Sequence, residues 1–544
     1  MRSLVIALVC VVPGSALADH PPATSKSAVM LLPGLGKHHH PVSTRNSEAQ
    51  KYFDQGLTLL YGFNHDEAAR SFSRAADLDP ELAMAYWGLA LVKGPNYNLD
   101  ADAGQWRAAN KALQMALKLS AKAPPPERAY IHALAKRYTE DPKADRHKLA
   151  IAYKTAMGKL TARYPDDLDA ATLYAESAMN LRPWKLWSHD AKPAEGTLEI
   201  LQVLESVLRR NPEHPGANHY YIHAIEASPY PERGLACARR LETLVPAAGH
   251  LVHMPAHIYI RIGDYAAAAR SNEHAIKADL AYIQRAKPKG AYPMMYFSHN
   301  IHFLAVARCF QGRSGDAWKA VEHLAEHVMP HVAEMPMLEG FLLAPPLVLA
   351  RFQRWDDILA ARLPGEKLKA ARAAWYFARG LAQLGKGNPA AAAKERQEFL
   401  ALKKVIPKET MISDWNSAQS VLAIAAAVLD AKLALAVKER ARCLDLLRRA
   451  VAMEDALAYG EPPDWFLPVR ETLGAALLDV GDAAEAEKVF RAGLAQHPRN
   501  PRCLFGLRES LKAQRKDYAA QMINIEFQRA WRHAEPQALR LEDL

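Results

Sequence analysis

Small and aromatic residues recur at a fixed spacing at the two ends of this chain. In the segment that starts at Ala49, they occupy positions 8, 20, 24, 27 and 32, as Gly56, Ala68, Phe72, Ala75 and Pro80. In a segment near the other end, they occupy positions 8, 15, 20, 24 and 32, as Gly474, Gly481, Ala486, Phe490 and Pro498. The intervening sequence is rich in alanine and has few β-branched runs, which favours helices over strands. We therefore predict a protein built from repeated pairs of helices.

This spacing resembles the tetratricopeptide repeat (TPR), a helix-turn-helix unit of 34 residues whose small residues let two helices cross closely. Weaker units surround Gly263 and Gly380. The resemblance covers residues 47–530, with insertions around 93–125, 182–196 and 280–297. Because one repeat cannot bury its own apolar face, the units are expected to stack into a right-handed superhelical solenoid with a concave and a convex surface. The predicted fold class is all-α, with a C-terminal tail over 531–544.

Several short sequence motifs indicate a narrower group within the TPR proteins. They lie at residues 53–56, 61–68, 85–88, 94–96 and 460–465, the last reading Gly-Glu-Pro-Pro-Asp-Trp. Together they resemble a group of secreted bacterial TPR proteins that is mostly uncharacterised. The resemblance implies a fold and a compartment, but it implies no reaction.

The N-terminus has the features of a secretory signal peptide. Arg2 precedes an apolar run from Leu4 to Val12, and the small-x-small pattern that ends at Ala18 is typical of a cleavage site. The run is too short to span a bilayer. We expect residues 1–18 to be removed, the mature chain to begin near Asp19, and the protein to be periplasmic or secreted.

Residues 19–46 are rich in Pro, Ser, Thr and His, and we expect a flexible lead-in to the first repeat. It contains the triplet His38, His39 and His40. The favoured interpretation is a solvated low-complexity tract, and the alternative is an arm that scavenges metal ions.

Composition excludes several classes of protein. The 544 residues are 50% hydrophobic and 24% charged, with a formal net charge of +10. The charge is spread along the chain, with no run of five basic residues, so we expect no nucleic-acid partner. Five cysteines without CxxC spacing do not make a disulfide framework. The sequence contains neither HExxH, a P-loop nor a dinucleotide fingerprint, and after the N-terminus it contains no expected transmembrane segment.

Histidines are concentrated in one section of the predicted solenoid. Of 22 histidines, 12 lie between residues 214 and 331. His219 and His253 are 34 residues apart, and so are His223 and His257, which is one TPR unit each time. In the TPR family, positions 2, 5, 9 and 12 of the first helix face the concave groove. The resemblance therefore implies that seven histidines from three consecutive inner helices face one surface: His219, His223, His250, His253, His257, His299 and His302.

The helical period supports this placement independently of the family. His250, His253 and His257 are spaced i, i+3, i+7, and His219 and His223 are spaced i, i+4, so each set lies on one side of its helix. Stacked helices lie about 8–10 Å apart, which lets imidazoles from neighbouring helices share one ion. A ligand set dominated by histidine suits copper or zinc better than calcium or magnesium. The sequence thus predicts a transition-metal site.

Other residues have two interpretations each. Glu176 and Asn180 are candidates to orient the ligands or to act as a base, or they belong to a solvated helix face; Glu226, at position 12 of its unit, is a further candidate to orient the ligands. Pro255 lies between His253 and His257, where it kinks the helix or starts it late, which leaves the directions of His250 and His253 open.

Aromatic, thiol and outer histidine side chains are assigned mainly to packing or surface. Trp87, Trp184 and Trp187 are expected to pack between repeats, with the floor of a ligand pocket as the alternative. His323, His327 and His331 fall on a second helix, so we expect them on the convex surface. Cys309 follows His302 by seven residues, and a thiol ligand there is the less favoured interpretation.

Two functions follow from these patterns. In the first, a periplasmic TPR solenoid binds copper or zinc in its groove, as a metal carrier or a metalloenzyme. In the second, the groove binds a peptide or a partner protein without a metal, and the histidines are hydrogen-bonding groups. The metal hypothesis predicts that imidazole nitrogens from several helices converge, whereas the scaffold hypothesis predicts that they spread along the groove.

Overall fold

The structure is a computed structural model that describes residues 29–535 and 539–544. Within these residues the chain is helical and has no strand, apart from two isolated bridges that join Trp187 to Pro193 and Met411 to Ser417. The predicted all-α, TPR-like superhelix is confirmed. The predicted signal peptide, 1–18, lies outside the described residues.

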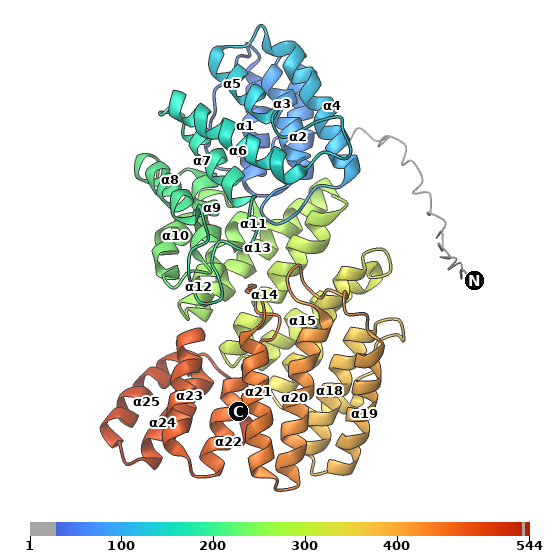
Figure 1. Ribbon diagram of the computed structural model, residues 1–544, viewed down its shortest axis with the longest axis vertical. Helices are drawn as coiled ribbons and strands as arrows, with labels where there is room; N and C mark the ends of the chain where they lie inside the picture. The colour runs from blue at the N-terminus through green and yellow to red at the C-terminus, as the bar shows by residue number, and fades with distance from the viewer. Residues whose placement is uncertain (1–28, 536–538) are drawn as a thin grey trace, which may run out of the picture.

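The helices follow one another as antiparallel neighbours (Figure 1). The first group comprises α1 (Ser47–Tyr61), α2 (His65–Leu78), α3 (Ala83–Val92), α4 (Ala103–Ser120), α5 (Pro125–Leu134), α6 (Arg146–Arg163), α7 (Leu168–Met179) and α8 (Thr197–Arg210). The central group comprises α9 (Pro215–Ile225), α10 (Leu235–Leu244), α11 (Gly249–His253), α12 (Pro255–Arg261), α13 (Tyr265–Ala286), α14 (Phe297–Phe310), α15 (Ser314–Val328), α16 (Ala344–Arg351) and α17 (Trp355–Ala360). The last group comprises α18 (Lys369–Gly385), α19 (Pro389–Val405), α20 (Ala418–Ala436), α21 (Arg440–Asp455), α22 (Val469–Asp479), α23 (Ala483–Gln496), α24 (Pro501–Ala513) and α25 (Asp517–Trp531). Short 3₁₀ turns and one π-helical turn complete the described chain: Pro231–Gly234, Met329–His331, Pro336–Leu343, Leu541–Asp543 and the π-helical Tyr292–Tyr296.

The repeat spacing has a direct packing cause in the first unit. A Cβ atom added to Gly56 on α1 would lie 2.8 Å from the ring of Phe72 on α2, and one added to Gly88 on α3 would lie 2.5 Å from the same ring. The fully buried Phe72 ring therefore fits only between two helices that lack side chains at the crossing. The alternation of glycine and phenylalanine in the sequence sets how closely the helices approach.

The last unit repeats this arrangement. Gly474 on α22 and Gly506 on α24 lie against the ring of Phe490 on α23, where added Cβ atoms would come within 2.4 and 2.1 Å of it. Asn64 and Asp482 accept hydrogen bonds from backbone N–H groups at the starts of α2 and α23, so the second helix begins with a capped N-terminus in both units.

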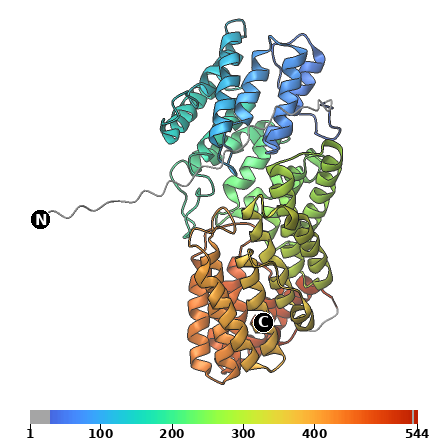
Figure 2. The same cartoon turned by 90° about the vertical axis from the view of Figure 1, so that its right-hand side faces the viewer.

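The C-terminal units fold back against the middle of the chain. Figures 1 and 2 show α22–α25, in red, beside the green central helices. The hydroxyl of Tyr265 on α13 donates to the carbonyl of Pro498 at 2.9 Å, and the ring of Phe310 on α14 packs on His497 with centroids 5.4 Å apart. The superhelix therefore brings His497 and Pro498 next to α13 and α14, although more than 180 residues separate them from Phe310 in sequence.

One helix of the described chain, α20, is long and apolar enough to cross a membrane by length and composition. Of its apolar window, 56% is buried inside the protein. It packs between α18 and α21 as a core helix.

Candidate metal centre

Four short helical segments carry the predicted ligands. α9 carries His219 and His223, α11 and α12 carry His250, His253 and His257, and α14 carries His299 and His302. Pro255 is the first residue of α12, where its missing N–H group costs no helical hydrogen bond. Met254, between α11 and α12, keeps helical backbone angles of −51° and −34°, so the three histidines of this segment remain on one side.

The Nδ1 atoms of four of these histidines contact oxygen acceptors. His219 Nδ1 lies 2.6 Å from the carbonyl of Tyr61, and His253 Nδ1 lies 2.7 Å from Oδ1 of Asn272. His223 Nδ1 and His257 Nδ1 lie 2.7 and 2.6 Å from the two carboxylate oxygens of Glu226. Because an oxygen of these types only accepts, each Nδ1 atom donates its proton, and each neutral ring keeps a bare lone pair on Nε2.

The Nε2 atoms converge in the interior. His219 and His250 face each other with Nε2 atoms 3.2 Å apart. The Nε2 atom of His253 lies 2.9 Å from that of His257 and 3.1 Å from that of His299. The six histidines form two triads, in each of which one ligand nitrogen per ring lies within 4.8 Å of the others: His219, His223 and His250, and His253, His257 and His299.

The two triads are adjacent parts of one cluster. The rings of His223 and His257 have centroids 5.7 Å apart, and those of His250 and His253 have centroids 5.8 Å apart. The Glu226 carboxylate joins the triads because it accepts from one histidine of each. We call the six residues the histidine cluster.

Burial favours the neutral form of three histidines of the cluster. Burial first, and then the charges of neighbouring imidazoles, lower the pKa of His219, His250 and His253 well below the ordinary value. Two buried ring nitrogens, His223 Nε2 and His250 Nδ1, have no hydrogen-bond partner in the described part of the chain. Neutral imidazoles with unused lone pairs are what a transition metal requires of its ligands.

Glu226 is held ionised by its histidine partners. Burial alone would raise the pKa of its carboxyl, but its two histidine partners, His257 first and then His223, lower it to about 2. The hydroxyl of Tyr459 adds a longer contact of 3.3 Å to Glu226 Oε2. Glu226 therefore occupies the orienting position that the sequence predicted for it.

Glu176 and Asn180 do not join the cluster. Asn180 donates to Glu176 at 2.5 Å, and the Glu176 carboxyl lies near the charge of Arg137. Of the two interpretations of these residues, support of the ligands does not hold, because Glu176 lies near Arg137 and the Asn180 amide lies 3.5 Å from the carbonyl of Pro95. His302 lies at the edge of the cluster, where its ring contacts Phe341 and Phe466 at centroid distances of 5.8 and 6.1 Å. It forms no hydrogen bond to another histidine ring of the described chain.

The tryptophans divide between packing and the site. The ring of Trp87 is buried against Tyr130, and Trp187 Nε1 donates to the carbonyl of Ala224 at 2.8 Å, so both are packing residues. Trp184 instead has its ring edge-on to His223 at 5.4 Å and lines a cavity beside the cluster. The expectation that Trp184 only packs between repeats is wrong.

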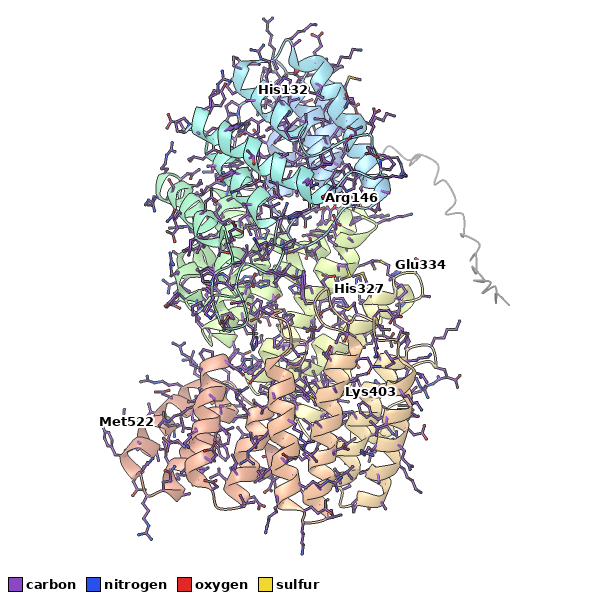
Figure 3. The ribbon with its side chains drawn as sticks, viewed as in Figure 1. His132, Arg146, His327, Glu334, Lys403 and Met522 are labelled. Atoms are coloured by element: carbon purple, nitrogen blue, oxygen red, sulfur yellow. The ribbon has the colours of Figure 1, made fainter. Side chains whose placement is uncertain are left out.

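The remaining histidine and cysteine candidates lie elsewhere. Near the end of α15, His327 (labelled in Figure 3) contacts the carbonyl of Pro293 through Nε2 at 2.9 Å, and its ring packs on Phe297. His323 and His331 contact no member of the cluster. Burial raises the pKa of the Cys309 thiol to about 12, so it is a buried thiol rather than an available ligand.

Sequence reasoning missed several residues that complete the site. Asn272 comes from α13, and Tyr459 and Glu461 come from the loop between α21 and α22. The sequence motif at residues 460–465 lies in this loop and marked it as distinctive, but nothing in the sequence indicated that the loop lies against α12. Burial raises the pKa of Glu461, which faces Arg261 and His257, to about 7.

A second group of histidines surrounds Asp169 on α7. His38 Nε2 and His40 Nδ1 lie 3.0 and 2.9 Å from its oxygens, and His214 Nε2 lies 3.2 Å away. His38 and His40 are thus docked side chains, 8% and 13% exposed, and the expectation of a solvated tract is wrong for them. His214 Nδ1 accepts from the backbone N–H of Ala217, so its proton is on Nε2 and is donated to Asp169. The ligand atoms of His38, Asp169 and His214 also lie close enough together to hold a metal ion, but here the histidines contact a carboxylate rather than one another.

Fold and site define an all-α, TPR-like solenoid protein with a buried histidine cluster. No protein-family model matches the chain, and no curated protein matches it. Among solved structures it is similar to human IFIT1 with m7Gppp-AAAA, at 15% identity and a TM-score of 0.34 over 90% of this chain and 91% of that chain. It is also similar to yeast Tom70, at 13% identity and a TM-score of 0.33 over 88% and 96% of the two chains. At these values the two neighbours carry no functional information about this chain.

Proposed function

We propose that this protein binds transition-metal ions, copper or zinc, at the two triads of the histidine cluster. The observation that carries the proposal is the pair His253 and His257. Both rings donate their Nδ1 protons to oxygen acceptors, yet their Nε2 atoms lie 2.9 Å apart. Two bare lone pairs repel at that distance unless a cation lies between them.

A metal ion satisfies this geometry better than a shared proton. Metal–nitrogen bonds of about 2.0–2.1 Å at angles of about 90–110° place two ligand nitrogens ~2.8–3.4 Å apart. The three close Nε2 pairs of the cluster, at 2.9, 3.1 and 3.2 Å, lie in this range. A shared proton would create a buried imidazolium, which the lowered pKa of His253 disfavours.

The ligand chemistry favours copper or zinc. Each triad offers three imidazole nitrogens and no thiolate, and a carboxylate accepts from the Nδ1 side of two of the rings. Three protein ligands leave a coordination position open, which is typical of catalytic metal sites rather than structural ones. A metalloenzyme is therefore part of the proposal.

The scaffold hypothesis predicts a different arrangement of these residues. A peptide-binding groove needs side chains that are spread along an accessible surface. His219, His253 and His257 are instead at most 1% exposed and converge from neighbouring helices. The solenoid is typical of interaction scaffolds, so a partner-binding surface away from the cluster is the working alternative if no metal is held.

The test is the metal content of tag-free protein purified without chelator. We expect copper or zinc to be retained through desalting, and His257→Ala to remove the ion of its own triad, since this residue contacts both Glu226 and His253. His323→Ala, an exposed histidine on α15, is the matched control and should leave the content unchanged. Wild-type protein that holds no metal, even after reconstitution with either ion, would overturn the proposal.

We also propose that the protein acts in the periplasm or outside the cell. The proposal is based on the sequence of residues 1–18 alone. Mass spectrometry of protein from a secreting host should find a mature N-terminus near Asp19. A mature chain that retains Leu4–Val12 would overturn it.

A further inference from the structure

A cavity of about 320 Å³ opens directly onto the histidine cluster. Its wall includes five histidines: His223, His250, His257, His299 and His302. Small-molecule sites in proteins have volumes of roughly 300–1,000 Å³, so this cavity suits a small ligand. Both triads contribute to the wall, which means that one ligand can reach either of them.

The rest of the wall is mostly aromatic and apolar. Its rings come from three distant parts of the chain: Trp184, Tyr296, Phe341, Trp415 and Phe466. Trp184 and Trp415 lie with ring centroids 5.1 Å apart, and the edge of Trp184 faces His223. Trp184 has a φ of 58°, a backbone conformation that a bulky side chain rarely adopts. Flat aromatic surfaces of this kind recognise a planar ring by offset stacking and edge contacts.

The polar groups of the wall restrict the charge of the ligand. No Lys or Arg is among the described residues that line the cavity, whereas Asp414, Glu461 and Asp464 do line it. An anionic phosphate or carboxylate ligand would therefore find no Lys or Arg partner among the described residues of this wall. Two lining residues, His223 and Trp184, present a buried Nε2 lone pair and a buried Nε1–H donor without a partner. A ligand oxygen can accept from the Trp184 donor, whereas the lone pair of His223 belongs to the proposed metal site.

We propose that this cavity binds a phenol or catechol whose oxygen coordinates the metal held by the histidine cluster. This inference rests on the proposed metal binding. On binding, the O–H bond of the ligand breaks, an oxygen–metal bond forms and the proton is released to solvent, with no change of oxidation state. The ring lies against Trp415 and Trp184, and the oxygen faces the triads.

The experiment uses the full chain loaded with zinc and 4-nitrocatechol as the probe, since the absorption spectrum of the probe reports its own coordination. Excess zinc is removed by desalting, and the metal content of every sample is measured before titration. We expect a saturable spectral shift, competition by unsubstituted catechol, and no competition by phenyl phosphate. Trp415→Ala should weaken probe binding at least tenfold with the zinc content unchanged, because Trp415 packs on Trp184 rather than on a cluster histidine.

Trp318→Ala is the matched control, because Trp318 lies outside the cavity and stacks with Arg354. It should bind the probe as the wild type does. Zinc-loaded protein that gives no spectral shift, or a Trp415→Ala variant that binds the probe as tightly as the control, would overturn this inference and leave metal binding standing. Protein that retains neither zinc nor copper would overturn both.

Discussion

His223 and His257 lie one repeat apart in sequence and donate their Nδ1 protons to the two oxygens of a single carboxylate, that of Glu226. Stacking of the repeats places the two imidazoles on neighbouring helices, with ring centroids 5.7 Å apart. Residues that are one repeat apart in sequence therefore contact the same carboxylate in the structure. Four predictions follow from this arrangement and from the docked N-terminal segment.

The first prediction concerns the number of bound ions. Since each triad has its own three rings, fully loaded protein should hold two ions per chain. His250→Ala and His299→Ala, one from each triad, should each reduce the content to about one ion, because a site loses its third ligand. Elemental analysis after desalting measures this. A wild type that holds one ion, abolished by either substitution, would show that the cluster acts as a single site.

The second concerns the charge of Glu226. Glu226→Gln keeps the shape of the side chain but offers only one acceptor oxygen, so one of the two partner rings loses its Nδ1 acceptor and shifts its proton to Nε2. We expect metal affinity to fall by about 10–100-fold, as for other residues that orient a ligand. Competition with a chelator of known affinity measures the change. Glu232→Gln, an exposed carboxylate near the same helix, should leave affinity unchanged.

The third concerns stability and pH in metal-free protein. Burial lowers the pKa of His219 and His250 in the folded state, so below about pH 6.5 the unfolded chain binds protons that the folded chain does not. The free energy of unfolding should therefore fall as pH drops from 6.5 to 5, by about 2 kcal/mol for each such histidine. Denaturant unfolding of chelator-treated protein measures the slope.

A variant pair checks the origin of that slope. His250→Gln should make the pH dependence shallower by about one histidine's share, whereas exposed His323→Gln should not change it. Equal slopes for both variants would show that the cluster is not the source of the pH dependence.

The fourth concerns Asp169 and the segment that precedes α1. Burial opposes its ionisation, but the charge of His38 and the hydrogen bonds from His214, His38 and His40 hold its pKa well below the usual range. Asp169→Ala should cost about 1–3 kcal/mol for each buried donor left without an acceptor. The melting temperature should fall, and trypsin should cleave faster after Lys37. Asp166→Ala, at a side chain 98% exposed, is the control for both measurements.

The repeat unit and the principal ligands could be derived from the sequence because both depend on local periods. Gly56, Phe72 and Gly88 are separated by fixed spacings that follow from two helices crossing at one aromatic ring. His219 and His253 share a register for the same reason. Prediction from sequence failed where the direction of a side chain depended on a neighbouring element. Glu176 lies near Arg137 rather than in the cluster. Trp184 lines the cavity beside the cluster.

The sequence alone therefore determined the all-α repeat, the section that carries the histidines and the helix faces on which they lie. Only the tertiary structure decided which nitrogen of each ring is free, because that depends on acceptors such as the Tyr61 carbonyl and Asn272, which lie on other helices. It also decided that Tyr459 and Trp415 close the site, since the superhelix must turn back on itself before residues so distant in sequence can meet α9 and α12. Local spacing fixes which side chains share a face, whereas long-range packing fixes what that face meets.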